Sequence, residues 1–121
     1  MKQEWIDQFN KKCALFIGGK KSKDTLPLIR ERLTENDYWL PKYGIKSLNQ
    51  MKFHSDWNWI MEVVEVIEKL GYEIDIFSNC VEICDIPDEN YIAEAVGKTK
   101  KEAVVQAINQ FLIWYNNGQR T

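Results

Sequence analysis

The residue types that most often carry catalysis stand together once in this chain, at His54 and Asp56. A histidine beside a carboxylate can act as a general base that the carboxylate orients. This pair, however, directly precedes an amphipathic stretch, where polar side chains commonly cap the start of a helix. We therefore interpret both residues as structural and expect a protein without enzymatic activity.

Metal and phosphate sites also lack their usual signatures. The chain has no short C-x-x-C or H-x-x-H pair, and the glycine pair at 18–19 lacks the spacing of a P-loop. A metal site would have to draw its ligands from separate elements, namely Cys13, His54, Cys80 and Cys84. The sequence therefore predicts neither a metal site nor a cofactor.

The charge of the chain is distributed unevenly. Its 121 residues suit a single domain, 1–121, and sixteen Lys and Arg against eighteen Asp and Glu give a net charge of −2. Residues 51–97 carry two basic and eleven acidic side chains, a net −9. The three cysteines are an odd number, and no apolar run approaches the roughly twenty residues of a membrane span. We expect a soluble, cytoplasmic protein with no membrane attachment.

The N-terminal part, residues 1–50, is predicted to be helical and irregular. Apolar side chains at helical spacing predict a helix over 3–17 that stops at the glycine pair, and a short helix is expected over 26–33. Residues 34–50 mix turn formers with aromatic residues, which indicates an irregular segment held by aromatic burial. An exposed aromatic patch there would instead be a partner site, with Tyr38 and Trp39 as its contacts.

A core of helix, three strands and helix is predicted over residues 51–117. Ser55 suits the N-cap of the first helix and Gly71 its end. Between them, apolar residues at spacings of three and four form one stripe: Ile60, Val63, Val64, Ile67 and Leu70.

Three strands are expected next, over 72–77, 80–85 and 91–96, with a tight turn at 78–79 and a loop at 87–90. Thr99 and Glu102 match a capping box that opens the final helix. The predicted fold is therefore α+β: an N-terminal helix, then helix, three-stranded antiparallel sheet, helix, with both core helices on the apolar sheet face.

Strand alternation would place carboxylates on the other face of this sheet. With the outward residues of the preceding helix they form a candidate partner-binding surface: Glu62, Glu65, Glu73, Asp75, Glu82 and Glu94. Such a surface presents a negative field to a nucleic-acid-binding protein, although an acidic face also serves ordinary solubility. Trp57 and Trp59 cannot both face the core, and we take Trp57 as a further aromatic contact.

The run FHSDWNWIMEVVEVIEKLGY at 53–72, with EAVVQAINQFLIWYNN at 102–117, resembles small uncharacterised phage and prophage proteins of the Bacteroidetes. More distantly, the layout is similar to the phage αβα-sandwich domain. This resemblance implies a phage accessory protein, a class that includes inhibitors of host defence such as anti-CRISPR proteins. Its expected partner is a host protein, for example a nucleic-acid-binding defence nuclease.

A second resemblance is to the double-stranded-RNA-binding domain, which has the same order of elements and basic residues at the start of its last helix. Here the corresponding residues are Lys98, Lys100 and Lys101. The resemblance implies phosphate contacts at that helix start. A third alternative is sequestration of a small signalling nucleotide between the first helix and residues 34–50, which requires a pocket there.

Overall fold

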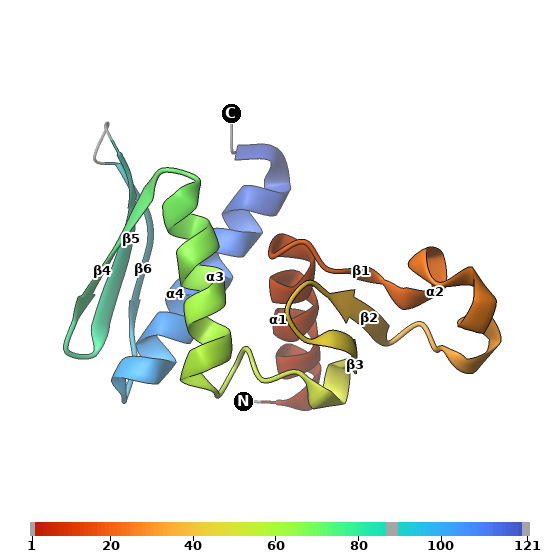
Figure 1. Ribbon diagram of the computed structural model, residues 1–121. Helices are drawn as coiled ribbons and strands as arrows, with labels where there is room; N and C mark the ends of the chain where they lie inside the picture. Colours follow the sequence, from red (N-terminus) through yellow and green to blue (C-terminus); the bar gives the residue numbers. More distant parts are fainter. Residues whose placement is uncertain (1, 87–89, 120–121) are drawn as a thin grey trace. The chain divides into compact units, whose positions relative to one another are not determined.

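The computed structural model describes residues 2–86 and 90–119. The chain forms two compact units, Met1–His54 and Ser55–Thr121. Each combines helices with a three-stranded antiparallel sheet (Figure 1), which confirms the predicted α+β class. No helix within the described ranges combines the length and the apolar character that a membrane span requires.

The N-terminal unit begins with helix α1 (Gln3–Phe16), close to the predicted 3–17. Phe9 and Cys13 lie on its predicted apolar side and are buried. The helix ends before Gly18, whose φ of +96° is one that glycine adopts readily. Gly19 must be glycine for a different reason, because a Cβ there would lie 2.5 Å from the carbonyl oxygen of Ala14.

The rest of this unit contains a sheet that the sequence did not predict. Tyr38 and Leu40 are buried and Trp39 between them is exposed, which is the alternation of a strand. The expectation of an irregular segment over 34–50 was therefore wrong, and the helix expected over 26–33 is a 3-10 helix. The elements in order are β1 (Lys20–Lys21), α2 (Ser22–Thr25), η1 (Pro27–Arg32), β2 (Asp37–Leu40), β3 (Gly44–Ser47) and η2 (Leu48–Gln50).

The second unit opens with helix α3 (Trp57–Lys69). Its N-cap is Asp56 and not Ser55 as predicted, because the Asp56 carboxylate accepts a hydrogen bond from Asn58 N at 2.8 Å. Gly71 follows the helix with φ +99°, as expected of a helix end. The predicted apolar stripe is buried except for Leu70, which is 47% exposed at the C-cap, where the helix no longer faces the sheet.

Three antiparallel strands follow with the predicted bounds: β4 (Tyr72–Phe77), β5 (Cys80–Asp85) and β6 (Tyr91–Val96), in the order β4-β5-β6. Ser78 has φ +51° in the tight turn between β4 and β5. Of the loop expected at 87–90, residues 87–89 lie outside the described part of the chain. The backbone N–H of Glu94, on β6, donates to Gln110 Oε1 at 3.0 Å.

The final helix is α4 (Lys100–Trp114), followed by a π-helical turn, η3 (Tyr115–Gln119). Thr99 caps α4 as predicted, since its hydroxyl oxygen accepts from Glu102 N at 3.1 Å. α4 packs along β5 and β6, and α3 packs along β4 (Figure 1). Both helices cover the same face of the sheet, and the core of this unit lies between them and the strands.

Candidate functional site

The candidate site is the sheet face that α3 and α4 leave uncovered, called here the outer face. The ring of Tyr72 lies 5.0 Å from that of Phe111 on α4, so Tyr72 points to the inner face. Because successive side chains alternate along a strand, its neighbours Glu73 and Asp75 belong to the outer face. The outer face comprises Glu73, Asp75 and Phe77 of β4, Cys80, Glu82 and Cys84 of β5, and Tyr91, Glu94 and Val96 of β6.

Strand register brings three of the predicted carboxylates into one line, the acidic row of Asp75, Glu82 and Glu94. Asp75 is opposite Glu82 on neighbouring strands, and Glu82 is opposite Glu94. Like charges directly opposite each other destabilise a sheet. Within the described residues, none of the three carboxylates forms an ion pair with a Lys or Arg. Among the described residues, the row therefore has no cationic side chain that offsets its repulsion.

Tyr91 also lies on the outer face, although strict alternation predicts that it points inward with Ala93 and Ala95. The register shifts between Ile83 and Cys84: Ala93 pairs with Ile83, but Tyr91 pairs with Cys84. Ile92 is thus the extra residue of a β-bulge, and a one-residue shift turns the preceding side chain to the other face. Tyr91 is consequently 68% exposed.

The acidic row dominates the electrostatics around Tyr91. Its carboxylates, chiefly that of Glu82, raise the pKa of the Tyr91 phenol, and partial desolvation and the Cys84 thiol act in the same direction. A raised pKa means that the phenolate anion is disfavoured there. The acidic row thus gives the outer face a negative potential that extends to Tyr91.

Exposed apolar side chains stand beside the acidic row, in the next cross-strand row along the sheet. Phe77 and Val96 both lie opposite Cys80 in the register, and both are exposed. Apolar contacts beside charged ones are typical of protein interfaces, where the apolar groups exclude water. Neither Phe77 nor Val96 is among the site residues predicted from the sequence.

Glu62 and Glu65 do not belong to this surface. They lie on α3, which covers the opposite, inner face of the sheet (Figure 1). Glu65 is exposed and Glu62 is half-buried. The single acidic surface that was expected is therefore two separate ones, and the sheet carries the larger group of carboxylates.

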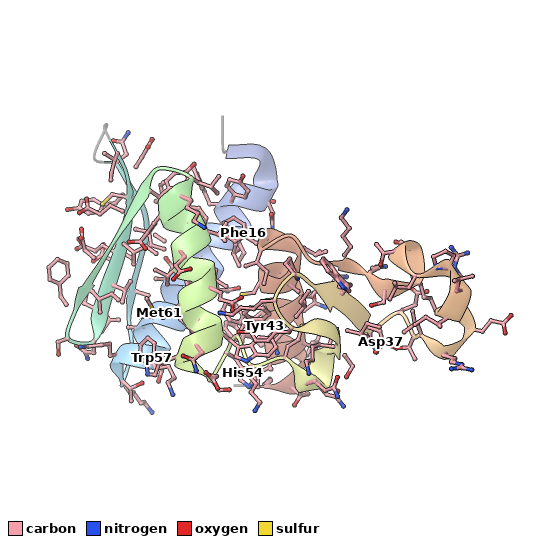
Figure 2. The ribbon with its side chains drawn as sticks, in the orientation of Figure 1. Phe16, Asp37, Tyr43, His54, Trp57 and Met61 are labelled. Atoms are coloured by element: carbon pink, nitrogen blue, oxygen red, sulfur yellow. The ribbon has the colours of Figure 1, made fainter. Side chains whose placement is uncertain are left out.

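The three aromatic candidates differ in accessibility. Tyr38 is only 1% exposed, so it belongs to the core of its unit and cannot serve as a surface contact, contrary to expectation. Trp39 and Trp57 are each somewhat more than one third exposed, whereas Trp59 is buried. Trp57 and Met61 lie on successive turns of α3 (Figure 2), and the Nζ of Lys101 lies 5.8 Å from the Trp57 ring centroid. Trp57 therefore packs under a cation.

The basic candidates lie around the start of α4. Lys98 and Lys100 are exposed and flank the Thr99 cap. Lys101 is half-buried, because its side chain lies over Trp57. Two of the three ammonium groups are thus presented to solvent next to the positive end of a helix.

A cavity of about 480 Å³ lies in the N-terminal unit, between α1 and residues 34–49. This is where nucleotide sequestration would require one. Its charged lining includes Asp7 and Asp37, and no Lys or Arg is present among the described residues that line it. Two carboxylates without a cation repel phosphate groups, so the cavity suits polar ligands that are neutral or cationic better than nucleotides.

His54 and Asp56, the residues first considered for catalysis, have separate hydrogen-bond partners. The Asn10 amide nitrogen lies 3.3 Å from Met51 O and 3.4 Å from His54 Nδ1. Because Met51 O can only accept, the amide nitrogen faces it and donates its other hydrogen to Nδ1. Burial lowers the pKa of His54, which Asp7 partly offsets. Burial thus disfavours the charged imidazolium of His54, while Asp56 caps α3.

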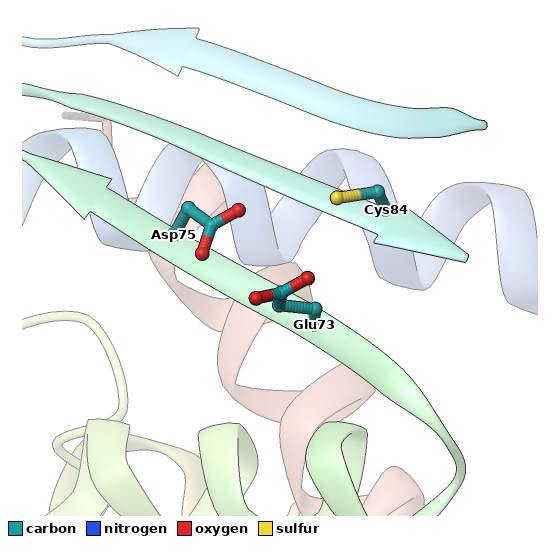
Figure 3. Close-up of side chains that lie close together, drawn as sticks. All are labelled: Glu73, Asp75 and Cys84. Carbon is teal, nitrogen blue, oxygen red and sulfur yellow. The ribbon is translucent and has the colours of Figure 1, made fainter. Parts of the chain in front are cut away.

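The two outer-face thiols are the functional candidates that the sequence reasoning did not combine with their neighbours. Cys84 lies with Glu73 and Asp75, and their ligand-type atoms are within 4.8 Å of one another (Figure 3). A second group, also of one thiol and two carboxylates, contains Cys80, Glu82 and Glu94. A search confined to cysteine and histidine spacing misses such groups, because their members come from different strands.

Comparison with protein-family models, with curated proteins and with solved structures finds no match to this chain. Its function must therefore be inferred from its own residues and their arrangement.

Proposed function

We propose that this chain is a phage-encoded binding protein, without enzymatic activity, that inhibits a host defence nuclease of the CRISPR type through its outer face. The observation that carries the proposal is the acidic row, in which Asp75, Glu82 and Glu94 are opposed across three strands. Their mutual repulsion lowers stability unless a cation relieves it. A cationic partner surface is a direct physical reason to retain such a row.

Charge and apolar contacts on the outer face would serve different steps of binding. A nuclease that holds nucleic acid does so in a groove lined by Lys and Arg, and the acidic row would be drawn into that groove. Phe77 and Val96, exposed beside the row, would then exclude water from the contact. The partner's cationic groove would be occupied and closed to its nucleic acid.

A pull-down from host lysate, at low and at high salt, tests this proposal. The variant D75N/E82Q/E94Q removes the acidic row and nearly preserves side-chain shape. A matched control, E4Q/E31Q/E68Q, removes three exposed carboxylates elsewhere and so has the same net charge. We expect wild type and control to retain a nucleic-acid-binding nuclease at low salt, duplex DNA to displace it, and the acidic-row variant to lose it.

Two results would contradict the proposal. Equal retention by the acidic-row variant and the control would remove the acidic row from the mechanism. A wild-type chain that retains no nuclease at low salt, with its fold verified by circular dichroism, would exclude this class of partner.

Double-stranded-RNA binding is the second candidate function. The observation that favours it is the order α3-β4-β5-β6-α4 with both helices on one sheet face, together with the exposed Lys98 and Lys100 at the start of α4. Phosphate contacts there would be screened by salt. A gel shift with a short RNA duplex at low salt compares K98Q/K100Q with a control on α1, K11Q/K12Q. Unchanged binding by K98Q/K100Q would discard this candidate.

A further inference from the structure

Helix α1 presents polar side chains to two adjoining cavities of the N-terminal unit. Residues three and four apart share a face of a helix, and Gln3, Asp7 and Asn10 have this spacing. Gln3 and Asp7 line the larger cavity, of about 480 Å³, while Gln3 and Asn10 line the smaller one, of about 200 Å³. Leu48 and Asn49 line both cavities. The two cavities share these walls and are together called here the α1 groove.

Asn10 gives the α1 groove a buried acceptor that lacks a donor. Asn10 is fully buried, and its Oδ1 accepts no hydrogen bond from a described residue. Its amide nitrogen faces Met51 O and His54 Nδ1, and all three residues line the smaller cavity. The amide group of Asn10 thus ends at the wall of this cavity. Because a buried carbonyl oxygen without a donor lowers stability, Oδ1 indicates a ligand that donates a hydrogen bond there.

The carboxylates of the α1 groove determine the charge of that ligand. Asp7 accepts from Gln3 Nε2 at 2.8 Å, and Asp37 accepts from Thr34 N at 2.7 Å. These donors are neutral, and neither carboxylate forms an ion pair within the described residues. The described residues that line the two cavities include no Lys or Arg. A ligand of the groove should therefore be cationic and carry neither phosphate nor carboxylate.

An elongated organic cation fits the α1 groove better than a metal ion does. Asp37 lines only the larger cavity and His54 only the smaller, and Figure 2 shows these two side chains apart. Among the described residues, neither they nor Asp7 belong to a group compact enough to hold one metal ion. The larger cavity is within the range of about 300–1,000 Å³ that is usual for small organic ligands. We propose that the α1 groove binds an aliphatic polyamine, whose ammonium groups contact Asp7 and Asp37 and donate to Asn10 Oδ1.

This proposal does not depend on the proposed nuclease partner, because the α1 groove belongs to the N-terminal unit and the outer face to the second. Isothermal titration calorimetry with spermidine tests it, at a salt concentration that screens binding to exposed carboxylates. We expect wild type to bind spermidine saturably, with one molecule per chain. D7N/D37N removes both charges of the groove and nearly preserves side-chain shape, so it should bind about tenfold more weakly or worse.

Two control variants separate the α1 groove from other acidic surfaces. E4Q/E31Q removes two exposed carboxylates of the same unit, and D75N/E82Q/E94Q removes the acidic row. Both should bind spermidine as wild type does. If D7N/D37N binds as tightly as E4Q/E31Q, or if binding is lost only in D75N/E82Q/E94Q, the assignment to the α1 groove is wrong.

NMR spectroscopy of the wild-type chain locates the ligand without any substitution. A hydrogen bond to Oδ1 changes the chemical shifts of the Asn10 side-chain amide group, so these resonances should move as spermidine saturates the protein. Saturation that leaves them in place would overturn the proposal, as would a wild-type protein that binds no spermidine.

Discussion

Asp75 and Glu82 lie directly opposite each other on the antiparallel strands β4 and β5, and Glu82 has Glu94 on its other side. Glu82 is therefore the carboxylate with two like-charged neighbours. We expect Glu82→Gln to raise the free energy of unfolding by about 0.5 kcal/mol at low salt. Urea denaturation measures this, with Glu68→Gln on α3 as a control that should change little. The gain should shrink as salt screens the repulsion, and a loss of stability would contradict it.

Tyr91 should ionise at a higher pH than an ordinary tyrosine, whose pKa is near 10. Glu82 is the main cause, so Glu82→Gln should bring the pKa of Tyr91 back down. The folded state holds this proton more tightly than the unfolded state, so stability decreases as pH rises beyond about 10. Phenolate absorbance of wild type, Glu82→Gln and Tyr91→Phe identifies the contribution of Tyr91. An unchanged titration in Glu82→Gln would show that the bulge does not bring Tyr91 to the acidic row.

His54 should make stability depend on pH in a narrow window. Its pKa is lowered from the ordinary 6.5 by burial, so the unfolded chain binds the proton more tightly. The stability contribution is complete above pH 6.5 and is lost as pH falls through the lower folded-state pKa. Urea denaturation between about pH 7 and pH 5, above the range of ordinary carboxylates, should show this decline. The free energy of unfolding of His54→Gln should not change across this pH window. If that of the wild-type protein is equally constant, the pKa of His54 is not lowered by burial.

Asp56 and Ser55 offer a matched pair that tests the start of α3. Asp56→Ala should lower the free energy of unfolding by about 1 kcal/mol, because Asn58 N loses its acceptor. Ser55→Ala, one residue earlier, should have little effect. Thermal or urea denaturation compares the two variants. Equal losses would mean that the N-cap is shared, and a larger loss for Ser55→Ala would restore the assignment made from sequence.

The second unit could be predicted closely because its local signals agree with one another. Alternation of apolar and polar side chains, bounded by turn formers, indicates the limits of β4, β5 and β6. Thr99 and Glu102 indicate the start of α4. The predicted N-cap of α3 was one residue too early, because Ser55 and Asp56 both suit that role. Side-chain type alone cannot decide between adjacent candidates.

The N-terminal sheet could not be predicted in the same way. β1 has two residues and β2 and β3 four each, too few to establish a period against the turn formers around them. The inward direction that alternation predicts for Tyr91 was wrong for another reason. The bulge at Ile92 depends on pairing with β5, and the alternation of residues in β6 does not indicate it. The thiol–carboxylate groups likewise exist only once the strands are in register.

The hydrogen bond from Glu94 N to Gln110 bears on self-association. β6 is an edge strand of its three-stranded sheet, and outward N–H groups on such an edge are a template for another chain. Gln110 occupies one of these donors from within the same chain, and the bulge at Ile92 interrupts the regular spacing that a newly added strand would need. The outer face can therefore be presented to solvent without the adjoining β6 edge recruiting further copies into a growing fibril.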